Sequence, residues 1–253
     1  MNAFVEREGA SKQLPLVFVL MSRRTQADYE QIFRAVVERI GNVEVEGFVA
    51  DFEVAVWYAV RAVCPGRDMK GCAFHWSQAV WRRVQHEGLA EVYRRRGGVF
   101  KFIRMLMALQ LLPAPHIPRA FETLFERAAT DATRRLVDYI SRQWVHGGSF
   151  EPSDWSVFRQ DVRTNNDLEG YHNRLNGKAG SGVGFYRLVP RLRQESEMVR
   201  LLVEGSDLHR ITTTRSAKVQ KSLASLWDKC EARECTTSEF LAKVGQAYGV
   251  VLE

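Results

Sequence analysis

The hydrophobic pattern alternates between short apolar runs and stretches in which apolar residues recur every three or four positions. The run Val45–Ala50 has the composition and length of a strand, and from Phe52 to Val63 the apolar spacing is helical. Asp51 stands where the two patterns meet. In an open α/β fold this end of a strand faces the ligand-binding edge, so Asp51 is a candidate site residue. The alternative is that Asp51 only caps the helix that follows.

The residues before this switch follow the same alternation. Ala3–Val5 is typical of the tail of a strand, and the run Leu14–Met21 predicts a strand that is covered on both faces. Thr25 and Asp28 have the spacing of a helix start, and Gly41 is a typical helix end. The pattern therefore predicts a helix between Thr25 and Gly41.

After the switch, Met69–Phe74 predicts a short strand, and Trp76, Val80 and Val84 recur at helical spacing. Strands that alternate with helices in this way predict an α/β sheet with helices on its faces. Between Gly88 and Asp161 the pattern predicts no strand and helices at 99–112, 119–129 and 131–144. Two more helices are predicted within 185–203 and around 219–227. We therefore expect four parts: the first part of an α/β core at 1–87, a mostly helical insertion at 88–161, a return to the core at 162–204, and a helical and polar tail at 205–253.

The return segment carries an unusual polar stripe. Glu169, His172, Asn173 and Asn176 share one face of a predicted helix, which Asn165 is placed to cap. A solvated face normally favours Lys, Arg and Glu, whereas this stripe suits the orientation of a ligand or of metal-bound water. We expect His172, Asn173 and Asn165 to act as orienting groups; the alternative for Glu169 is an ordinary surface position.

Composition narrows the classes of function. The chain has 253 residues, of which 45% are hydrophobic and 26% charged, as in a globular protein. No apolar run approaches the roughly 20 residues that cross a bilayer, so we expect no membrane partner. The net charge of +6 permits a nucleic-acid partner. Much of the excess lies between Trp81 and Arg104, where the candidate DNA contacts are Arg82, Arg83, Arg94, Arg95, Arg96 and Lys101. The alternative is that this basic cluster is only a solvated face.

Two acids from distant parts of the chain, Asp51 and Glu169, suit a shared divalent cation, because Mg²⁺ favours carboxylate oxygens. Two such ions about 4 Å apart activate a nucleophile and stabilise the leaving oxygen at a phosphodiester. Cys72 and His75 also have the spacing of metal ligands. A zinc site needs about four ligands, and Cys230 and Cys235 are far away in the chain, so we favour a structural core pair without zinc.

Several stretches together resemble the Mutator-like element (MULE) transposases over residues 14–203. The resemblance implies a ribonuclease H-like fold with a helical insertion before the last acid. It also implies DNA cleavage and strand transfer by a DDE triad with Mg²⁺ or Mn²⁺, and we expect a nuclear location. Asp51 matches the second acid and Glu169 the third, and Cys72 and His75 match the Cys-x-x-His motif of the family. The stretches are Leu14–Phe18, Thr25–Tyr29, Ala50–Glu53, Gly71–Ala79 and Thr164–Asn176.

The first acid of the triad has no counterpart. In the family it lies on the first strand of the sheet, whereas this chain begins inside the second strand, and Glu6 and Glu8 follow that strand. We therefore expect a transposase-derived, N-terminally truncated protein that is inactive in strand transfer, acting with a second copy or a transposase partner. The alternative is a domesticated, non-catalytic nuclear factor that binds DNA or another protein.

Overall fold

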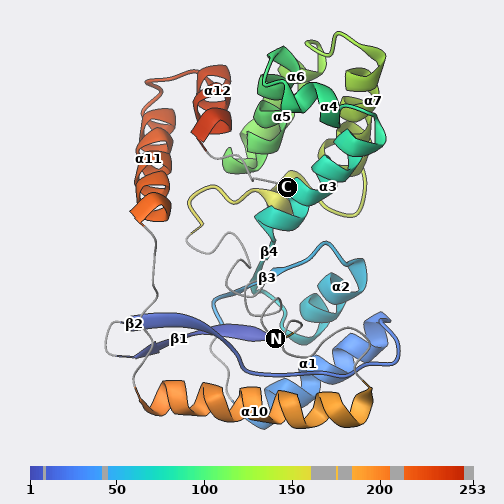
Figure 1. The fold of residues 1–253 in the computed structure, drawn as a ribbon, viewed down its shortest axis with the longest axis vertical. Coiled ribbons are helices and arrows are strands. Elements are labelled where there is room, and N and C mark those ends of the chain that lie inside the picture. Colours follow the sequence, from blue (N-terminus) through green and yellow to red (C-terminus); the bar gives the residue numbers. More distant parts are fainter. Residues whose placement is uncertain (8–9, 42–44, 161–174, 176–183, 206–213, 248–253) are drawn as a thin grey trace. The chain divides into compact units, whose positions relative to one another are not determined.

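The structure, a computed structural model, describes residues 1–7, 10–41, 45–160, 175, 184–205 and 214–247 (Figure 1). The chain divides into two compact units. Unit 1 combines Met1–Arg24 with Asn165–Thr213, and unit 2 combines Thr25–Thr164 with Thr214–Glu253. No helix within the described ranges is both long and apolar enough to span a membrane.

Unit 1 contains an antiparallel hairpin of β1 (Asn2–Arg7) and β2 (Ala10–Pro15). β1 includes the predicted strand tail Ala3–Val5, which is confirmed. The predicted strand Leu14–Met21 is wrong beyond its first two residues, because β2 ends at Pro15.

The register of the hairpin explains this early end. Asn2, the first residue of β1, pairs with Pro15, and the ladder ends at this pair. Met1 makes the last contacts, since its carbonyl accepts hydrogen bonds from the amides of Leu16 and Val17 at 3.0 and 3.2 Å. The apolar composition of the run could not reveal where its partner strand begins.

The long helix α10 (Phe185–Glu204) completes the described part of unit 1 and contacts β2. It agrees with the helix predicted within 185–203, and Pro190 lies inside it. None of its side chains is buried, and the ion pairs Arg193–Glu197 and Arg200–Glu204 join successive turns.

Unit 2 begins with α1 (Gln26–Ile40), whose ends are those that the sequence predicts. The Thr25 hydroxyl accepts from the Asp28 amide at 3.3 Å, and the Asp28 carboxylate accepts from the Thr25 amide at 3.2 Å. Gly41 closes the helix with φ +80°, a backbone conformation that side chains disfavour. The predicted helix is confirmed.

A β–α–β unit follows, in which β3 and β4 run parallel and are joined through α2. Ala50 at the end of β3 lies opposite Gly71 at the end of β4. The predicted strand Met69–Phe74 is too long, because α3 begins at Ala73, which is buried on the same helix face as Trp76. The bounds are β3 (Gly47–Ala50), α2 (Val54–Val63), β4 (Asp68–Gly71) and α3 (Ala73–His86).

The architecture is mixed α/β, but the described strands form two separate two-stranded sheets, β1–β2 and β3–β4. The single sheet that the alternation predicts is therefore not formed by these strands. Each sheet pairs two strands that follow one another in the chain. The hydrophobic alternation carries no information on pairing between distant strands.

Residues 88–160 form helices without a strand, and the predicted helices at 99–112, 119–129 and 131–144 are confirmed within a few residues. Trp76 stacks on Trp155 with ring centroids 4.9 Å apart, and the Trp155 indole donates to the Trp144 carbonyl at 2.9 Å. The elements are α4 (Ala90–Arg94), α5 (Gly98–Ala108), η1 (Leu109–Leu111), η2 (Ala114–His116), α6 (Ile117–Phe125), α7 (Asp131–Ile140), the π-helical turn η3 (Ser141–Val145) and α8 (Pro152–Trp155).

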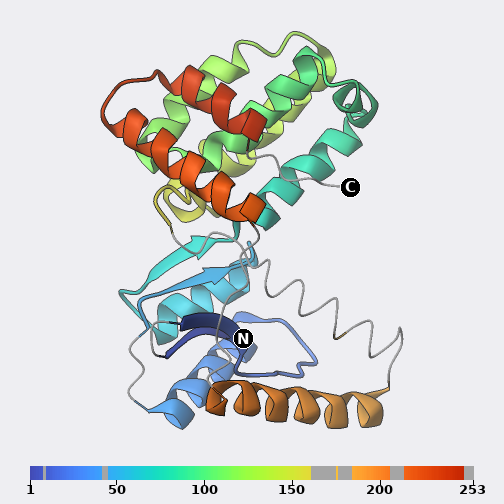
Figure 2. The ribbon, with the colours of Figure 1, turned by 60° about the vertical axis from the view of Figure 1, so that its left-hand side comes forward.

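The C-terminal helices α11 (Thr214–Glu231) and α12 (Thr237–Ala247) belong to the core of unit 2. Figure 2 shows both helices against the helical part of the unit, and α12 contacts α5. Leu223, Trp227 and Phe240 are buried, and the Trp227 indole donates to the Leu111 carbonyl at 2.8 Å. The helix predicted at 219–227 is confirmed and is longer, whereas α12 had no prediction.

Candidate active site

Asp51 directly follows β3, and its side chain is 59% exposed. Its backbone is held in place, because the Trp57 indole donates to the Asp51 carbonyl at 2.8 Å. Asp51 does not cap α2: the N-cap residue is Glu53, which makes no side-chain cap. Two residues separate Asp51 from the helix, so the interpretation of Asp51 as a cap is wrong and its carboxylate is left for other contacts.

The carboxylate of Asp51 meets His75 in the first turn of α3. His75 Nδ1 lies 2.8 Å from Asp51 Oδ1. The contact with Asp51, and secondly the contact with Cys72, raises the pKa of His75 to about 10, while partial burial opposes the rise. His75 is therefore cationic at neutral pH, and the two side chains form an ion pair.

Cys72 lies at the N-cap position of α3 and is fully buried. Its amide donates to the Ala50 carbonyl at 2.8 Å, which joins the start of α3 to the end of β3. The Cys-x-x-His motif thus places Cys72 beneath the site and His75 beside Asp51. Within the described ranges no group of three His, Cys, Asp or Glu residues could hold a metal ion.

An aromatic layer supports this strand end. The ring of Phe52, the residue after Asp51, lies so close to Gly71 that a Cβ at position 71 would fall 2.1 Å from its Cζ atom. Phe52 also packs edge-on to Trp144 and Phe150, with centroids 4.7 and 5.1 Å away. Glycine at 71 therefore lets Phe52 seal the core directly below the candidate site.

A second acidic side chain, Glu53, points elsewhere. It accepts a hydrogen bond from the Tyr29 hydroxyl of α1 at 3.0 Å. This contact joins α1 to the start of α2. Sequence reasoning did not identify it, and neither residue type nor spacing indicates such a long-range pair.

The remaining predicted site residues cannot be placed beside Asp51. Glu169, His172, Asn173 and Asn165 lie outside the described residues. Their assignment as third acid and orienting groups stays a prediction.

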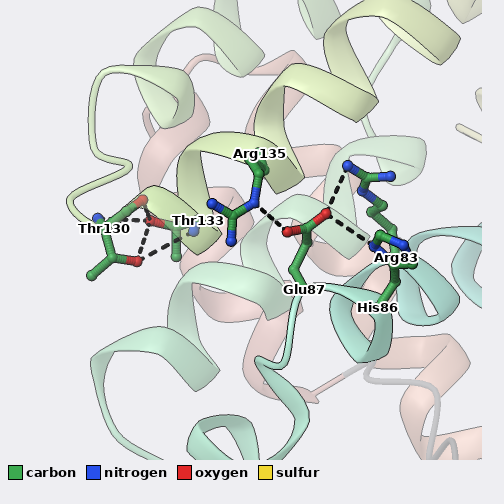
Figure 3. Close-up of polar contacts among 6 residues, drawn as sticks. All are labelled: Arg83, His86, Glu87, Thr130, Thr133 and Arg135. Atoms are coloured by element: carbon green, nitrogen blue, oxygen red, sulfur yellow. Dashed lines mark hydrogen bonds and ion pairs between the residues drawn. The ribbon is translucent and has the colours of Figure 1, made fainter.

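The residues of the basic cluster differ in how far they and their acidic partners are exposed to solvent. Arg83 pairs with Glu87 at 2.7 Å, and Arg135 of α7 approaches the other oxygen of Glu87 at 2.5 Å (Figure 3). The Glu87 side chain is only 4% exposed. The Arg135 contact, helped by His86 and Arg83, lowers the pKa of Glu87 below its usual value. Arg83 thus belongs to a charged cluster at the end of α3 that Arg135 connects to α7.

Other members of the basic cluster lie on or near the corner between α4 and α5. Arg94 and Arg95 share Glu91 at 3.4 and 4.0 Å, with all three side chains at least 66% exposed. Arg96 and Lys101 are also exposed. Arg82 donates to Gln78 at 2.9 Å on the exposed side of α3. We call Arg94, Arg95, Arg96 and Lys101 the corner patch.

A family model described as MULE transposase domain matches residues 1–79. Residues 1–79 are therefore similar to the MULE transposase domain. The match includes Asp51, Cys72 and His75, which supports the assignment of this chain to the MULE transposases. The corner patch and Glu169 follow the matched residues in the chain. No curated protein and no solved structure matches the chain.

The sequence contained one unused indication of the geometry of this site. Asp51 follows β3, and the Cys-x-x-His motif follows β4, its parallel neighbour. The carboxyl ends of neighbouring parallel strands meet at one edge of a sheet. A strand assignment that ended at Gly71 would therefore have placed His75 beside Asp51.

Proposed function

We propose that this chain is a transposase-like DNA-handling domain related to enzymes of DNA cleavage and strand transfer. The observation that carries the proposal is the match of residues 1–79 to the MULE transposase domain. Within the matched residues, Asp51 and His75 lie 2.8 Å apart at the end of β3. A carboxylate at a strand end is a suitable position for a phosphodiester reaction, because the sheet fixes it while solvent and substrate can reach it.

Asp51 would hold a Mg²⁺ or Mn²⁺ ion together with Glu169. The donor chemistry fits, since the Asp51 side chain is 59% exposed and has a second carboxylate oxygen besides the one that faces His75. A bound ion would supply Lewis-acid activation of a water molecule or 3′-hydroxyl. His75 orients Asp51, and its positive charge lowers the affinity of that carboxylate for a cation.

We further propose that residues 1–253 by themselves are catalytically incomplete, because they offer counterparts for only two of the three acids. Two carboxylates neutralise less of the positive charge of two divalent ions than three carboxylates do. We therefore expect weaker metal binding and the loss of the in-line geometry of the reaction. The second candidate function is a domesticated nuclear factor that binds DNA, or a protein partner, without cleaving it. The exposed corner patch favours DNA as the ligand.

A cleavage assay tests the catalytic part. Purified full-length chain is incubated with supercoiled DNA in Mg²⁺ or Mn²⁺, beside the Asp51→Asn variant. We expect no nicking or joining by either protein. Metal-dependent cleavage that Asp51→Asn abolishes would overturn catalytic incompleteness and establish Asp51 as a catalytic residue.

A binding assay tests the DNA-handling part. Fluorescence anisotropy with a labelled duplex compares wild type with a variant carrying Arg95→Ala, Arg96→Ala and Lys101→Ala. We expect the DNA affinity of wild type to fall as the salt concentration rises. In the variant, the slope of log affinity against log salt concentration should decrease by the equivalent of about two to three phosphate contacts. Arg134→Ala, an exposed arginine of α7 paired with Asp131, is the control and should leave the slope unchanged. Equal loss in both variants, or no binding by wild type, would contradict the corner patch as the DNA surface.

A further inference from the structure

Arg159 is held at an unusual point of the backbone. Its φ of +58° lies in the left-handed region, which residues with a Cβ disfavour. Such a conformation persists only where surrounding contacts enforce it. The contacts of the Arg159 side chain are therefore expected to stabilise this disfavoured backbone conformation.

The side chain of Arg159 reaches α11, far away in the sequence. Its Nη2 lies 2.6 Å from Asp228 and forms a second, shorter ion pair with Glu231. The guanidinium also lies 5.9 Å from the ring centroids of Phe158 and Trp227. The segment before residue 161 and α11 lie side by side in both ribbon views (Figures 1 and 2).

The residues just before Arg159 are anchored differently. The Ser156 hydroxyl donates to the Leu112 carbonyl at 2.6 Å, and the Val157 amide donates to the Gln110 carbonyl at 2.8 Å. Both residues are buried. Beyond Val157, the ring of Phe158 packs against Trp227, and Arg159 forms ion pairs with α11.

We propose that Arg159, Asp228 and Glu231 form a latch that holds residues 158–160 on α11 and that salt can open without unfolding the helical core. The three side chains are 39%, 66% and 52% exposed, so mobile ions reach them and screen their attraction. The buried anchors at Ser156 and Val157 are insensitive to salt. The left-handed backbone at Arg159 favours release once the ion pairs weaken. The latch does not depend on DNA binding or cleavage.

Hydrogen exchange measured by mass spectrometry on the full chain tests the latch. Peptides covering 158–160 are compared with peptides from α5 at about 50 mM and about 500 mM salt. We expect high salt to speed exchange at 158–160 in wild type by about tenfold and to leave α5 unchanged. Asp228→Asn combined with Glu231→Gln should speed exchange there at both salt concentrations and remove its salt dependence.

Two further variants separate the latch from the backbone strain. Arg159→Lys keeps a positive charge and should keep part of the protection and its salt dependence. Arg233→Gly is the matched control, because Arg233 also has φ +58° but is not part of the latch. It should leave exchange at 158–160 unchanged. The latch is refuted if the double variant protects 158–160 as well as wild type does, or if α5 loses protection in parallel.

Discussion

His75 Nδ1 lies 2.8 Å from Asp51 Oδ1. Asp51 directly follows β3, and His75 lies in the first turn of the helix that follows β4, the parallel neighbour of β3. The strand β3 delivers the acid, and the start of α3 delivers the base. The carboxylate at the candidate site is therefore already partly neutralised by its own fold. A metal ion or a DNA phosphate at this position has to compete with, or accommodate, a cationic imidazole.

The ion pair predicts a titration that can be observed directly. His75, with its pKa raised to about 10, should remain protonated throughout the neutral range. In Asp51→Asn the neighbouring negative charge is lost, and the His75 pKa should fall by about 1 to 3. Nuclear magnetic resonance of the imidazole nitrogens measures both values. A His75 pKa that is the same in both proteins would contradict the ion pair.

Gly71→Ala should disturb the candidate site through the core. The added Cβ would meet Phe52 at 2.1 Å, so the ring must move away from its aromatic neighbours. We expect a loss of about 1–3 kcal/mol in the free energy of unfolding, as for overpacked cores. Gly98→Ala is the control, because no atom lies within 4 Å of a Cβ there. Denaturant unfolding followed by tryptophan fluorescence measures the difference, and equal stabilities would refute the close contact.

Glu87 predicts a pH dependence of stability. Its pKa is lower in the folded protein than the usual 4.5, so the charged carboxylate stabilises the fold above that pH. The contribution is lost as pH falls through the lower folded value. Glu87→Gln should cost about 1–2 kcal/mol at neutral pH and flatten this acid slope.

Urea unfolding at several pH values between neutrality and about pH 3 tests the role of Glu87. Glu91→Gln is a suitable control, since its side chain is 66% exposed and its ion pairs are open to solvent. It should change stability little. A wild-type curve that is flat in acid would argue against the ion pair between Arg135 and Glu87.

The C-terminal helices should contribute strongly to the stability of unit 2. Phe240 on α12 is fully buried, so Phe240→Ala should cost about 3–5 kcal/mol. Phe125→Ala, at a position that is 41% exposed, should cost much less. Thermal unfolding of the two variants compares them. Similar melting temperatures would mean that α12 is not part of the core.

Local patterning was enough to predict most individual elements. Thr25, Asp28 and Gly41 define both ends of α1 through short-range hydrogen bonds and one backbone conformation, and these depend only on neighbouring residues. The same is true of the switch from strand to helix around Asp51. The family resemblance also depended on contiguous residues, and it is supported over residues 1–79.

Tertiary structure decided which residues meet. Leu14–Met21 reads as one strand, but the ladder stops at Pro15, because the position of its partner β1 sets the length. Arg83 and Arg95 look alike in the sequence, yet one holds a buried carboxylate and the other faces solvent. Periodicity reports the preference of each segment for a conformation and a buried face. The pairing of strands and the burial of charge depend on segments brought together in space, which no local pattern encodes.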